Sequence, residues 1–235
     1  MLAMRQIMLG PRGGAKVPTA ADYVQDGLVA MWDGIENAGW RTHDASATTW
    51  KDLIGSADAT LQSSGSWGSN SLLCAGGTIA AQDGSSIDTF RTMEICLKRT
   101  GTATAFVVVV SSGNGNGVLI VKDNLAFGFG YYNNTRYYPP TNEISSGATI
   151  CGAWDNNPAS SADVAAYVNG ASVARSATES NPGFGSGGSV VFGARQYGIY
   201  PFAGKIYCVR LYSRALTAAE IAANYAIDKE RFNLP

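Results

Sequence analysis

The chain has 235 residues and a mass of 24.6 kDa, which fits one large all-β domain. Its residues are 46% hydrophobic and only 15% charged, so they can bury a full core, which excludes a disordered chain and a coiled coil. The 17 basic residues nearly cancel the 18 acidic ones, and this balance provides no field that would attract nucleic acid or an anionic membrane.

Three residue types narrow the chemistry and the fold further. The single histidine, His43, excludes zinc sites built from several histidines. The 28 glycines exceed the usual share and indicate many turns between short strands. The cysteines form no CxxC pair, so neither a metal knuckle nor a redox motif is expected. Free thiols are favoured over two disulfides for these four residues, Cys74, Cys96, Cys151 and Cys208.

Residues 1–22 are predicted to form an N-terminal arm, and residues 23–235 a single domain. Arg5, Pro11 and Arg12 interrupt the apolar pieces of the arm, so it lacks the unbroken apolar stretch of a signal peptide. No apolar run approaches the roughly 20 residues of a membrane helix, and membrane insertion is not expected. The apolar residues of the arm would either pack back on the domain or dock on a partner, and docking is slightly favoured.

From Leu28 onward, short apolar runs alternate with Gly, Asn, Asp and Ser, which predicts an antiparallel sandwich or barrel of roughly ten to twelve strands. The series opens at residues 28–32. Residues 106–110 show no alternation of polar and apolar side chains, so both faces of this strand should be covered. Further central strands are predicted at residues 91–98, 104–110, 118–121 and 125–129.

Residues 164–174 carry the clearest local signal, because Asn169 and Gly170 separate two apolar runs. Asn-Gly tolerates the positive φ angles of a type I′ turn, which predicts a two-residue hairpin. Later strands are expected at residues 188–194 and 206–212. In the last strand, strict alternation places Ile206, Cys208, Arg210 and Tyr212 on one face and Tyr207, Val209 and Leu211 on the other.

The chain is predicted to end in a short helix. Thr217 and Glu220 form a capping box, in which the threonine hydroxyl accepts from the Glu220 amide and the carboxylate reaches back to the threonine amide. A helix of about two to three turns should follow through Asp228, with Ile221 and Tyr225 packing on the sandwich.

A sugar-binding patch is predicted at residues 131–138, where tyrosines alternate with amides and an arginine. Sugars present apolar C–H faces and polar rims, so a binding site needs flat aromatic rings with amide or guanidinium groups. An equally weighted alternative is that these tyrosines stabilise a hairpin. Trp154 with Asp155 offers a second combination, for which the structural alternative is favoured. The candidate ligand-binding residues are Tyr131, Tyr132, Asn133, Asn134, Arg136, Tyr137, Tyr138, Trp154 and Asp155.

The catalytic groups of an enzyme are not evident. Glycosidases hold two carboxylates about 5 to 10 Å apart. Only one glutamate, Glu230, has an acidic residue two or four positions away, and its neighbour Asp228 lies at the end of the predicted helix and not on a strand. His43 lies in a loop without a nucleophile-elbow motif and is expected to be solvated or a local hydrogen-bond partner. The chain is therefore not expected to be an enzyme.

Three stretches resemble a known family, the laminin G-like jelly-roll domains of the concanavalin A-like lectin/glucanase superfamily, and especially single-domain versions from gut bacteria and their phages. Residues 27–34 (GLVAMWDG) and 50–55 (WKDLIG) resemble its opening, and residues 166–170 (AYVNG) its hairpin. Residues 202–221 (FAGKIYCVRLYSRALTAAEI) match its closing signature. The resemblance covers about residues 23–235 and implies an all-β, two-sheet antiparallel jelly roll with a short C-terminal helix.

The resemblance also bears on individual residues. Arg210, Arg214 and Glu220 of the closing signature are expected to brace the last strand against the helix. Laminin G relatives often bind calcium, which makes Ca²⁺ a possible cofactor, with ligands from loop carboxylates, amides and carbonyls. The alternative, favoured at each position, is that these turn residues bond their own backbone. The candidates are Asp33, Asn37, Asp44, Asp52, Asp58, Asp155, Asn156 and Asn157.

These observations favour a non-catalytic, lectin-like recognition and adhesion module. The resemblance suggests a phage virion surface protein, with a surface glycan or host-cell surface as one partner and other virion or assembly proteins contacted through the arm. A bacterial cell surface, or an extracellular location reached without the Sec route, is the alternative. The alternative functions are a purely structural assembly module without a glycan ligand and, third, a glycoside-active enzyme. Neither nucleic acid nor a membrane is expected as a partner.

Overall fold

The structure is a computed structural model. It describes residues 17–62, 65–76, 80–82, 87, 90–111, 117–131, 134–154, 164–174, 189–194 and 198–235. For residues 80–82, 111, 117–118, 130–131 and 134–137, it describes only the backbone.

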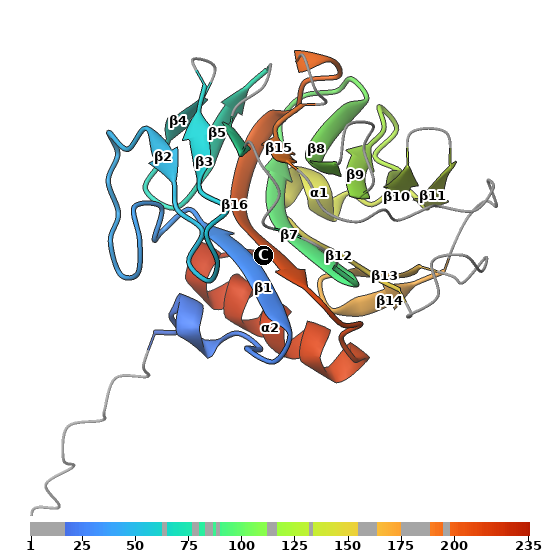
Figure 1. Cartoon of the computed structure of the whole chain (residues 1–235). Coiled ribbons are helices and arrows are strands. Elements are labelled where there is room, and N and C mark those ends of the chain that lie inside the picture. The colour runs from blue at the N-terminus through green and yellow to red at the C-terminus, as the bar shows by residue number, and fades with distance from the viewer. Residues whose placement is uncertain are drawn as a thin grey trace, which may run out of the picture.

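The described residues form two antiparallel β-sheets packed face to face, which confirms the predicted sandwich (Figure 1). We call the sheet that carries the long C-terminal helix the helix-side sheet. Its order is β14-β13-β12-β7-β16-β5-β4, and β1 also pairs with β16. Its strands are β1 (Leu28–Asp33), β4 (Gly65–Trp67), β5 (Leu72–Ala75), β7 (Thr92–Arg99), β12 (Ala148–Ala153), β13 (Ala165–Val168), β14 (Ala171–Val173) and β16 (Ala203–Tyr212).

The second sheet, which we call the opposite sheet, has the order β11-β10-β9-β8-β15-β6-β3-β2. Its strands are β2 (Thr49–Trp50), β3 (Ala59–Leu61), β6 (Ala80–Gln82), β8 (Ala105–Ser111), β9 (Gly117–Val121), β10 (Phe127–Tyr131), β11 (Asn134–Tyr138) and β15 (Ser189–Phe192). Strands β2 and β11 therefore lie at opposite edges. A 3-10 helix, η1 (Ala20–Asp22), precedes β1, and a short helix, α1 (Glu143–Ser146), joins β11 to β12.

Strand β8 has both faces covered, as its unbroken apolar run predicts. Val107, Val108 and Val110 belong to the core between the sheets, whereas Phe106 and Val109 form a separate buried cluster with Ile120 and Val191. A register shift between Phe106 and Val108 lets neighbouring valines face the same side, because an extra residue interrupts strict alternation.

A second bulge corrects the predicted alternation in β16. The pairing of β16 with β7 shifts between Ile206 and Cys208. Ile206 therefore joins Val209 and Leu211 in the core between the sheets, and Tyr207 joins Cys208 on the helix side. The predicted alternation was wrong at Ile206 and Tyr207, because the extra residue of the bulge turns the side chains that precede Cys208 to the opposite face of the sheet.

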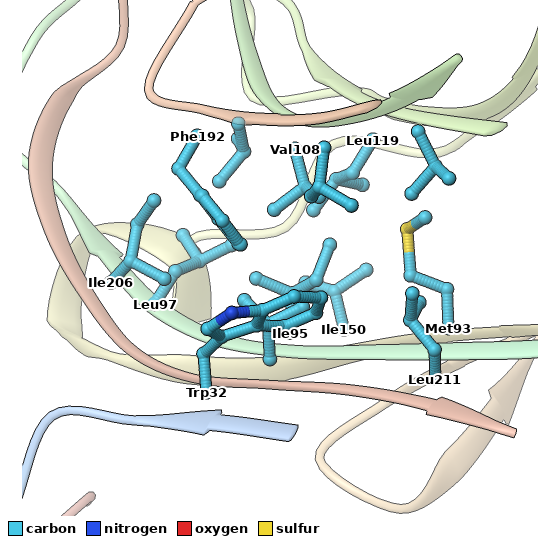
Figure 2. Packing of buried hydrophobic residues seen from close by; sticks show 14 of the residues in the cluster. Trp32, Met93, Ile95, Leu97, Val108, Leu119, Ile150, Phe192, Ile206 and Leu211 are labelled. Carbon is cyan, nitrogen blue, oxygen red and sulfur yellow. The ribbon is translucent and has the colours of Figure 1, made fainter. Parts of the chain in front are cut away.

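Apolar side chains fill the space between the sheets. Figure 2 shows Trp32, Ile95 and Leu211 rising from the helix-side sheet toward Val108 and Phe192 of the opposite sheet. The ring of Phe192 contacts both Trp32 and Trp50, each at a centroid distance of 5.0 Å. The two sheets are thus joined by close-packed apolar contacts without a charged group among the members of this cluster.

The C-terminal helix, α2 (Ala218–Phe232), begins at the predicted capping box. The Thr217 hydroxyl accepts from the Glu220 amide, and the Glu220 carboxylate accepts from the Thr217 amide. The helix is longer than predicted: it continues to Phe232, which is buried, and ends at Asn233 with φ +52°. The last turn forms because Phe232 adds buried apolar area that the sequence pattern did not reveal.

The layer between α2 and the helix-side sheet contains buried charges. Arg210 lies 2.9 Å from the Glu94 carboxylate and 2.7 Å from that of Asp228, and all three are fully buried. Asn224 donates to Glu94, and the Arg210 guanidinium lies 4.0 Å from the centre of the Tyr23 ring. The helix is therefore held by Arg210, as predicted, and Arg214 pairs with Glu220 at its start.

The described end of the predicted arm packs on the domain. Residues 20–22 form η1, whose Ala20 amide donates to Glu36, and Arg231 of α2 donates to the Pro18 carbonyl. The prediction that the arm docks on a partner is untested, since residues 1–16 lie outside the described residues.

The predicted free thiols are confirmed. All four cysteines are unpaired and buried, and burial raises the pKa of each thiol. Three of them, Cys96, Cys151 and Cys208, lie in the layer under α2. Within the described part of the chain, neither helix has the length and hydropathy that crossing a membrane requires.

Candidate functional site

A groove of about 460 Å³ opens beside the segment that joins β11 to α1. Pro139, Pro140 and Thr141 form one wall directly after the tyrosine-rich strand, and the β13–β14 hairpin forms the other. Ligand pockets commonly have about 300 to 1,000 Å³ and an apolar lining with a few polar groups, and this groove has both properties. Its lining residues are Phe127, Pro139, Pro140, Thr141, Glu143, Val168, Asn169, Ala171 and Val173.

The hairpin wall follows from the Asn-Gly signal. Asn169 and Gly170 have φ angles of +52° and +77°, which confirms the predicted two-residue turn. A Cβ atom added to Gly170 would come within 3.0 Å of the Ala222 Cα atom in α2, so the turn also fits against the helix. The turn thus fixes the hairpin, and Ala171 and Val173 line the groove because alternate residues of a strand share a face.

Two polar side chains give the groove its chemistry. The Glu143 carboxylate accepts from the Thr141 hydroxyl, and this hydrogen bond lowers the pKa of Glu143, so the group is an anionic acceptor at neutral pH. The Asn169 Oδ1 atom accepts from the Thr149 amide at 3.0 Å. An amide also carries an NH₂ donor, for which no partner is found among the described residues. The groove therefore combines apolar walls, a carboxylate acceptor and an amide donor.

The structure places the end of the tyrosine segment in the core. Tyr138 is 1% exposed, stacks on Phe127 at a centroid distance of 5.2 Å and donates its hydroxyl hydrogen to the Val164 carbonyl. The prediction that Tyr138 stacks on a sugar at the surface is therefore wrong, because its ring is buried. Tyr138 instead packs behind Phe127, and Phe127 lines the groove.

The rest of the segment is described by its backbone or not at all. Strands β10 and β11 form the hairpin that the alternative interpretation expects, with Tyr131 opposite Asn134, Phe129 opposite Arg136, and Gly128 opposite Tyr137. Tyr132 and Asn133 lie outside the described residues. The ligand-binding prediction for these six residues therefore stays a prediction.

The second predicted combination loses its aromatic member. Trp154 is 4% exposed and packs edge-on against Phe90 at a centroid distance of 5.2 Å. A buried ring cannot stack on a sugar at the surface, so the structural alternative is supported for Trp154. Asp155, Asn156 and Asn157 lie outside the described residues.

Two pairs of carboxylates that the structure brings together are buried and bound to arginines. Glu94 and Asp228 share Arg210, and Asp33 and Glu36 share Arg231. These four carboxylates have no access to a substrate, because each is at most 4% exposed. His43 places Nδ1 3.1 Å from the Gly34 carbonyl oxygen, which confirms its prediction as a local hydrogen-bond partner.

The candidate calcium ligands of the described chain bond to neighbouring groups. Asp52 accepts from the amides of Met31, Ile54 and Ala57, and Asp44 accepts from Ser46. Asp58 accepts from Lys51, Asp33 pairs with Arg231, and Asn37 bonds the backbone of Asp44. No group of three or more His, Cys, Asp or Glu side chains in the described residues is arranged to hold a metal ion, so these residues do not fit a Ca²⁺ site.

Sequence reasoning missed most of the groove. It placed the candidate site on Tyr138 and its neighbours, but the groove begins one residue later, at Pro139. Glu143 and Asn169 lie 26 residues apart in the chain and share one groove because β12 and β13 bring the hairpin beside α1. The Asn-Gly pair was visible in the sequence, but as a turn signal only.

Comparison with known proteins agrees with this architecture. The model of the concanavalin A-like lectin/glucanases superfamily, Laminin_G_3, matches residues 75–222. This match covers more than half of the chain, and the chain therefore belongs to this superfamily, as the resemblance of its motifs predicted. A search of curated proteins found no match.

Solved structures with this fold include two proteins of sialidase origin. The sialidase of Trypanosoma rangeli, in complex with 2,3-difluorosialic acid, has a TM-score of 0.61 and 16% identity over 98% of this chain. The chain spans only 37% of that protein. The Ruminococcus gnavus IT-sialidase CBM40, bound to alpha2,3 sialyllactose, has a TM-score of 0.50 and 18% identity over 65% of this chain and 95% of its own. At these identities the similarity shows the fold alone.

Proposed function

We propose that this chain is a non-catalytic carbohydrate-recognition module that binds a neutral sugar in the groove beside α1. The observation that carries the proposal is the composition of the groove, in which Pro139, Pro140 and Val173 provide apolar walls beside Glu143 and Asn169. A sugar ring matches this pattern, because its C–H face packs on apolar groups while its hydroxyls donate to a carboxylate and accept from an amide.

The charge of the groove selects among sugars. Glu143 is its one titratable group among the lining residues, and its lowered pKa keeps it anionic. An anionic sugar would meet like-charge repulsion there, whereas a neutral sugar can donate hydroxyl hydrogens to the carboxylate. The fold shared with CBM40, a carbohydrate-binding module, supports glycan recognition in general but does not identify the sugar.

The absence of catalysis is part of the proposal. It is supported by two described carboxylate pairs, which are buried against Arg210 and Arg231 instead of facing a groove. Hydrolysis of an oligosaccharide by the chain, abolished when one carboxylate is substituted, would contradict it.

The test is a glycan array followed by calorimetric titration with lactose as the first neutral probe. Ala171→Trp places a large ring in the groove and should reduce lactose affinity at least tenfold, and Glu143→Gln should reduce it severalfold. Ser172→Trp is the matched control. Residue 172 is the next on β14, so its side chain points to the other face, and this variant should bind as the wild type does.

The outcomes separate clearly. Equal losses in Ala171→Trp and Ser172→Trp would mean that the added indole disturbs β14 rather than the groove. An array without any bound glycan would overturn the proposal and leave the structural assembly module as the remaining interpretation. The virion surface location is a finer hypothesis that rests on the sequence resemblance alone, and immunogold labelling of phage particles tests it.

A further inference from the structure

Trp40 differs from every other tryptophan of the chain. Trp32, Trp50, Trp67 and Trp154 are at most 8% exposed, whereas Trp40 is 45% exposed. Trp40 lies in the loop between β1 and β2, at the sandwich edge opposite the β11 edge and its groove (Figure 1). An exposed indole exposes apolar area that folding would normally bury, so its position calls for an explanation.

Buried side chains hold the loop in place. Glu36, which is 4% exposed, accepts from the Arg41 amide at 2.8 Å and from Arg231 at 3.2 Å. Asn37 is fully buried and bonds both the amide and the carbonyl of Asp44, each at 2.8 Å. The loop is therefore fixed at both sides of its tip, and Trp40 is presented on a rigid support.

The tip of the loop breaks a local conformational rule. Residues 39–42 form a turn closed by a hydrogen bond of 2.9 Å from the Thr42 amide to the Gly39 carbonyl. Arg41, the third residue of this turn, has φ +57°, a region that favours Gly or Asn. An arginine in this position is less stable than a glycine would be, and such residues cluster at functional sites.

The guanidinium of Arg41 is available to a ligand. Arg41 is exposed, and no ion pair or side-chain hydrogen bond of its guanidinium is found among the described residues. The other charged group of the tip, Asp44, is exposed too, but its carboxylate accepts from the amide and the hydroxyl of Ser46. Arg41 is thus the cation that follows the exposed Trp40 directly in the chain.

We propose that Trp40 and Arg41 form a second binding site, selective for a sugar that carries a carboxylate. The indole packs on the apolar face of the sugar ring, and the guanidinium pairs with the carboxylate through parallel hydrogen bonds. The inference rests on the proposed carbohydrate recognition but concerns a different surface. The groove, with Glu143, should prefer a neutral sugar, whereas the loop, with Arg41, should prefer an anionic one.

The experiment uses the Ala171→Trp chain, in which the groove is blocked, and titrates it with 3′-sialyllactose and with lactose. These probes differ only by the carboxylate-bearing sugar. The expected result is that sialyllactose binds at least tenfold more tightly than lactose, and that Trp40→Ala and Arg41→Gly each lower its affinity at least tenfold. In the wild-type chain, where Trp40 is the exposed tryptophan, sialyllactose should also protect it from acrylamide quenching.

Arg41→Gly separates a binding role from a structural one. Glycine suits positive φ, so this variant should melt at the same temperature as its parent or at a higher one while losing affinity. Loss of affinity with a lower melting temperature would mean that Arg41 only supports the loop, and would overturn the inference. Tyr200→Ala is the control, since Tyr200 is also 45% exposed with φ +53°, and it should bind sialyllactose as its parent does.

Failure of this inference differs from failure of the groove proposal. If Ala171→Trp abolishes sialyllactose binding in an otherwise unchanged chain, the loop is not a site and the groove accounts for all binding. If the wild type binds sialyllactose through Trp40 and Arg41 but binds neither lactose nor any neutral glycan of the array, the loop site is supported and the groove proposal is wrong. If neither sialyllactose nor any neutral glycan binds, both are overturned.

Discussion

The two layers that flank the helix-side sheet differ in chemistry, although the same strands supply both. Toward the opposite sheet, β16 contributes Val209 and Leu211 to an apolar core. Toward α2, the same strand contributes Cys208, Arg210 and Tyr212, and Arg210 meets buried carboxylates. One layer is held mainly by apolar contacts, and the other by apolar contacts and a buried ionic network.

The difference teaches how each layer fixes its geometry. Apolar contacts are non-directional, so the core between the sheets is specified by shape and volume. The network under α2 is directional, because Arg210 donates to Glu94 and Asp228 in one arrangement, and Tyr23 and Thr149 donate to Asp228 as well. It therefore ties the helix, the segment before β1 and three strands to a single relative position.

The largest expected effect comes from removing the cation of the network. Arg210→Met leaves Glu94 and Asp228 buried without their cation, and the free energy of unfolding should fall by about 3 to 5 kcal/mol in urea denaturation. The triple variant Arg210→Met, Glu94→Gln, Asp228→Asn should recover most of the loss, since no buried charge remains. A triple variant as unstable as the single one would show that shape, not charge, governs this layer.

The apolar core should respond to volume and not to pH. Leu119→Ala removes a fully buried side chain between the sheets and should lower the free energy of unfolding by about 3 kcal/mol. Because this cluster contains no carboxylate or imidazole, and burial raises the pKa of its one thiol, Cys74, the loss should be equal at pH 5 and pH 7. A loss that changes between these two pH values would break the contrast between the layers.

The sequence predicted the local features of both layers better than their joint geometry. The capping box of Thr217, the Asn169-Gly170 turn and the apolar strands are signals of adjacent residues, and the structure confirms them. The β16 bulge was missed because alternation contains no mark of an extra residue. The network was seen only as Arg210 bracing the helix, since its partners Glu94 and Asp228 lie 116 and 18 residues away.

The candidate site was less predictable than the fold for the same reason. Aromatic composition pointed to residues 131–138, but burial of Tyr138 depends on the stacking of β10 and β11 against the core. The groove combines the end of one hairpin with the turn of another, and the exposure of Trp40 depends on Glu36 and Asn37. None of these relations is a pattern of neighbouring residues.

A pH titration should distinguish the layers through Asp33, which pairs with Arg231 beside the network. Burial raises the pKa of Asp33 from 3.8 to about 6 despite Arg231. The folded chain therefore holds this proton more tightly than the unfolded chain, and the stabilisation, complete below about pH 4, is lost as pH rises through 6. The expected decrease is about 2 to 3 kcal/mol between pH 4 and 7.

Asp33→Asn is the variant that tests this dependence. It removes the titrating carboxyl group. The difference in unfolding free energy between variant and wild type should therefore change by about 2 to 3 kcal/mol between pH 4 and pH 7, even if the substitution also shifts stability equally at every pH. Titratable groups far from Asp33 remain in both chains and cancel from the comparison. A difference that stays constant from pH 4 to pH 7 would show that Asp33 does not titrate there.

The smallest effect is expected at the start of α2, where Thr217→Ala removes the cap. The lost hydrogen bond to the Glu220 amide should cost about 1 kcal/mol, and Thr217→Ser should restore it because serine offers the same oxygen.

Arg214 lowers the pKa of Glu220 to about 2, so the contribution of this carboxylate is present above pH 4.5 and is lost as pH falls through 2. If the buried network of Arg210 positions the helix, Thr217→Ala should leave the affinities for lactose and sialyllactose unchanged. If Thr217→Ala instead lowers the free energy of unfolding as much as Arg210→Met does, the cap and not the network positions the helix.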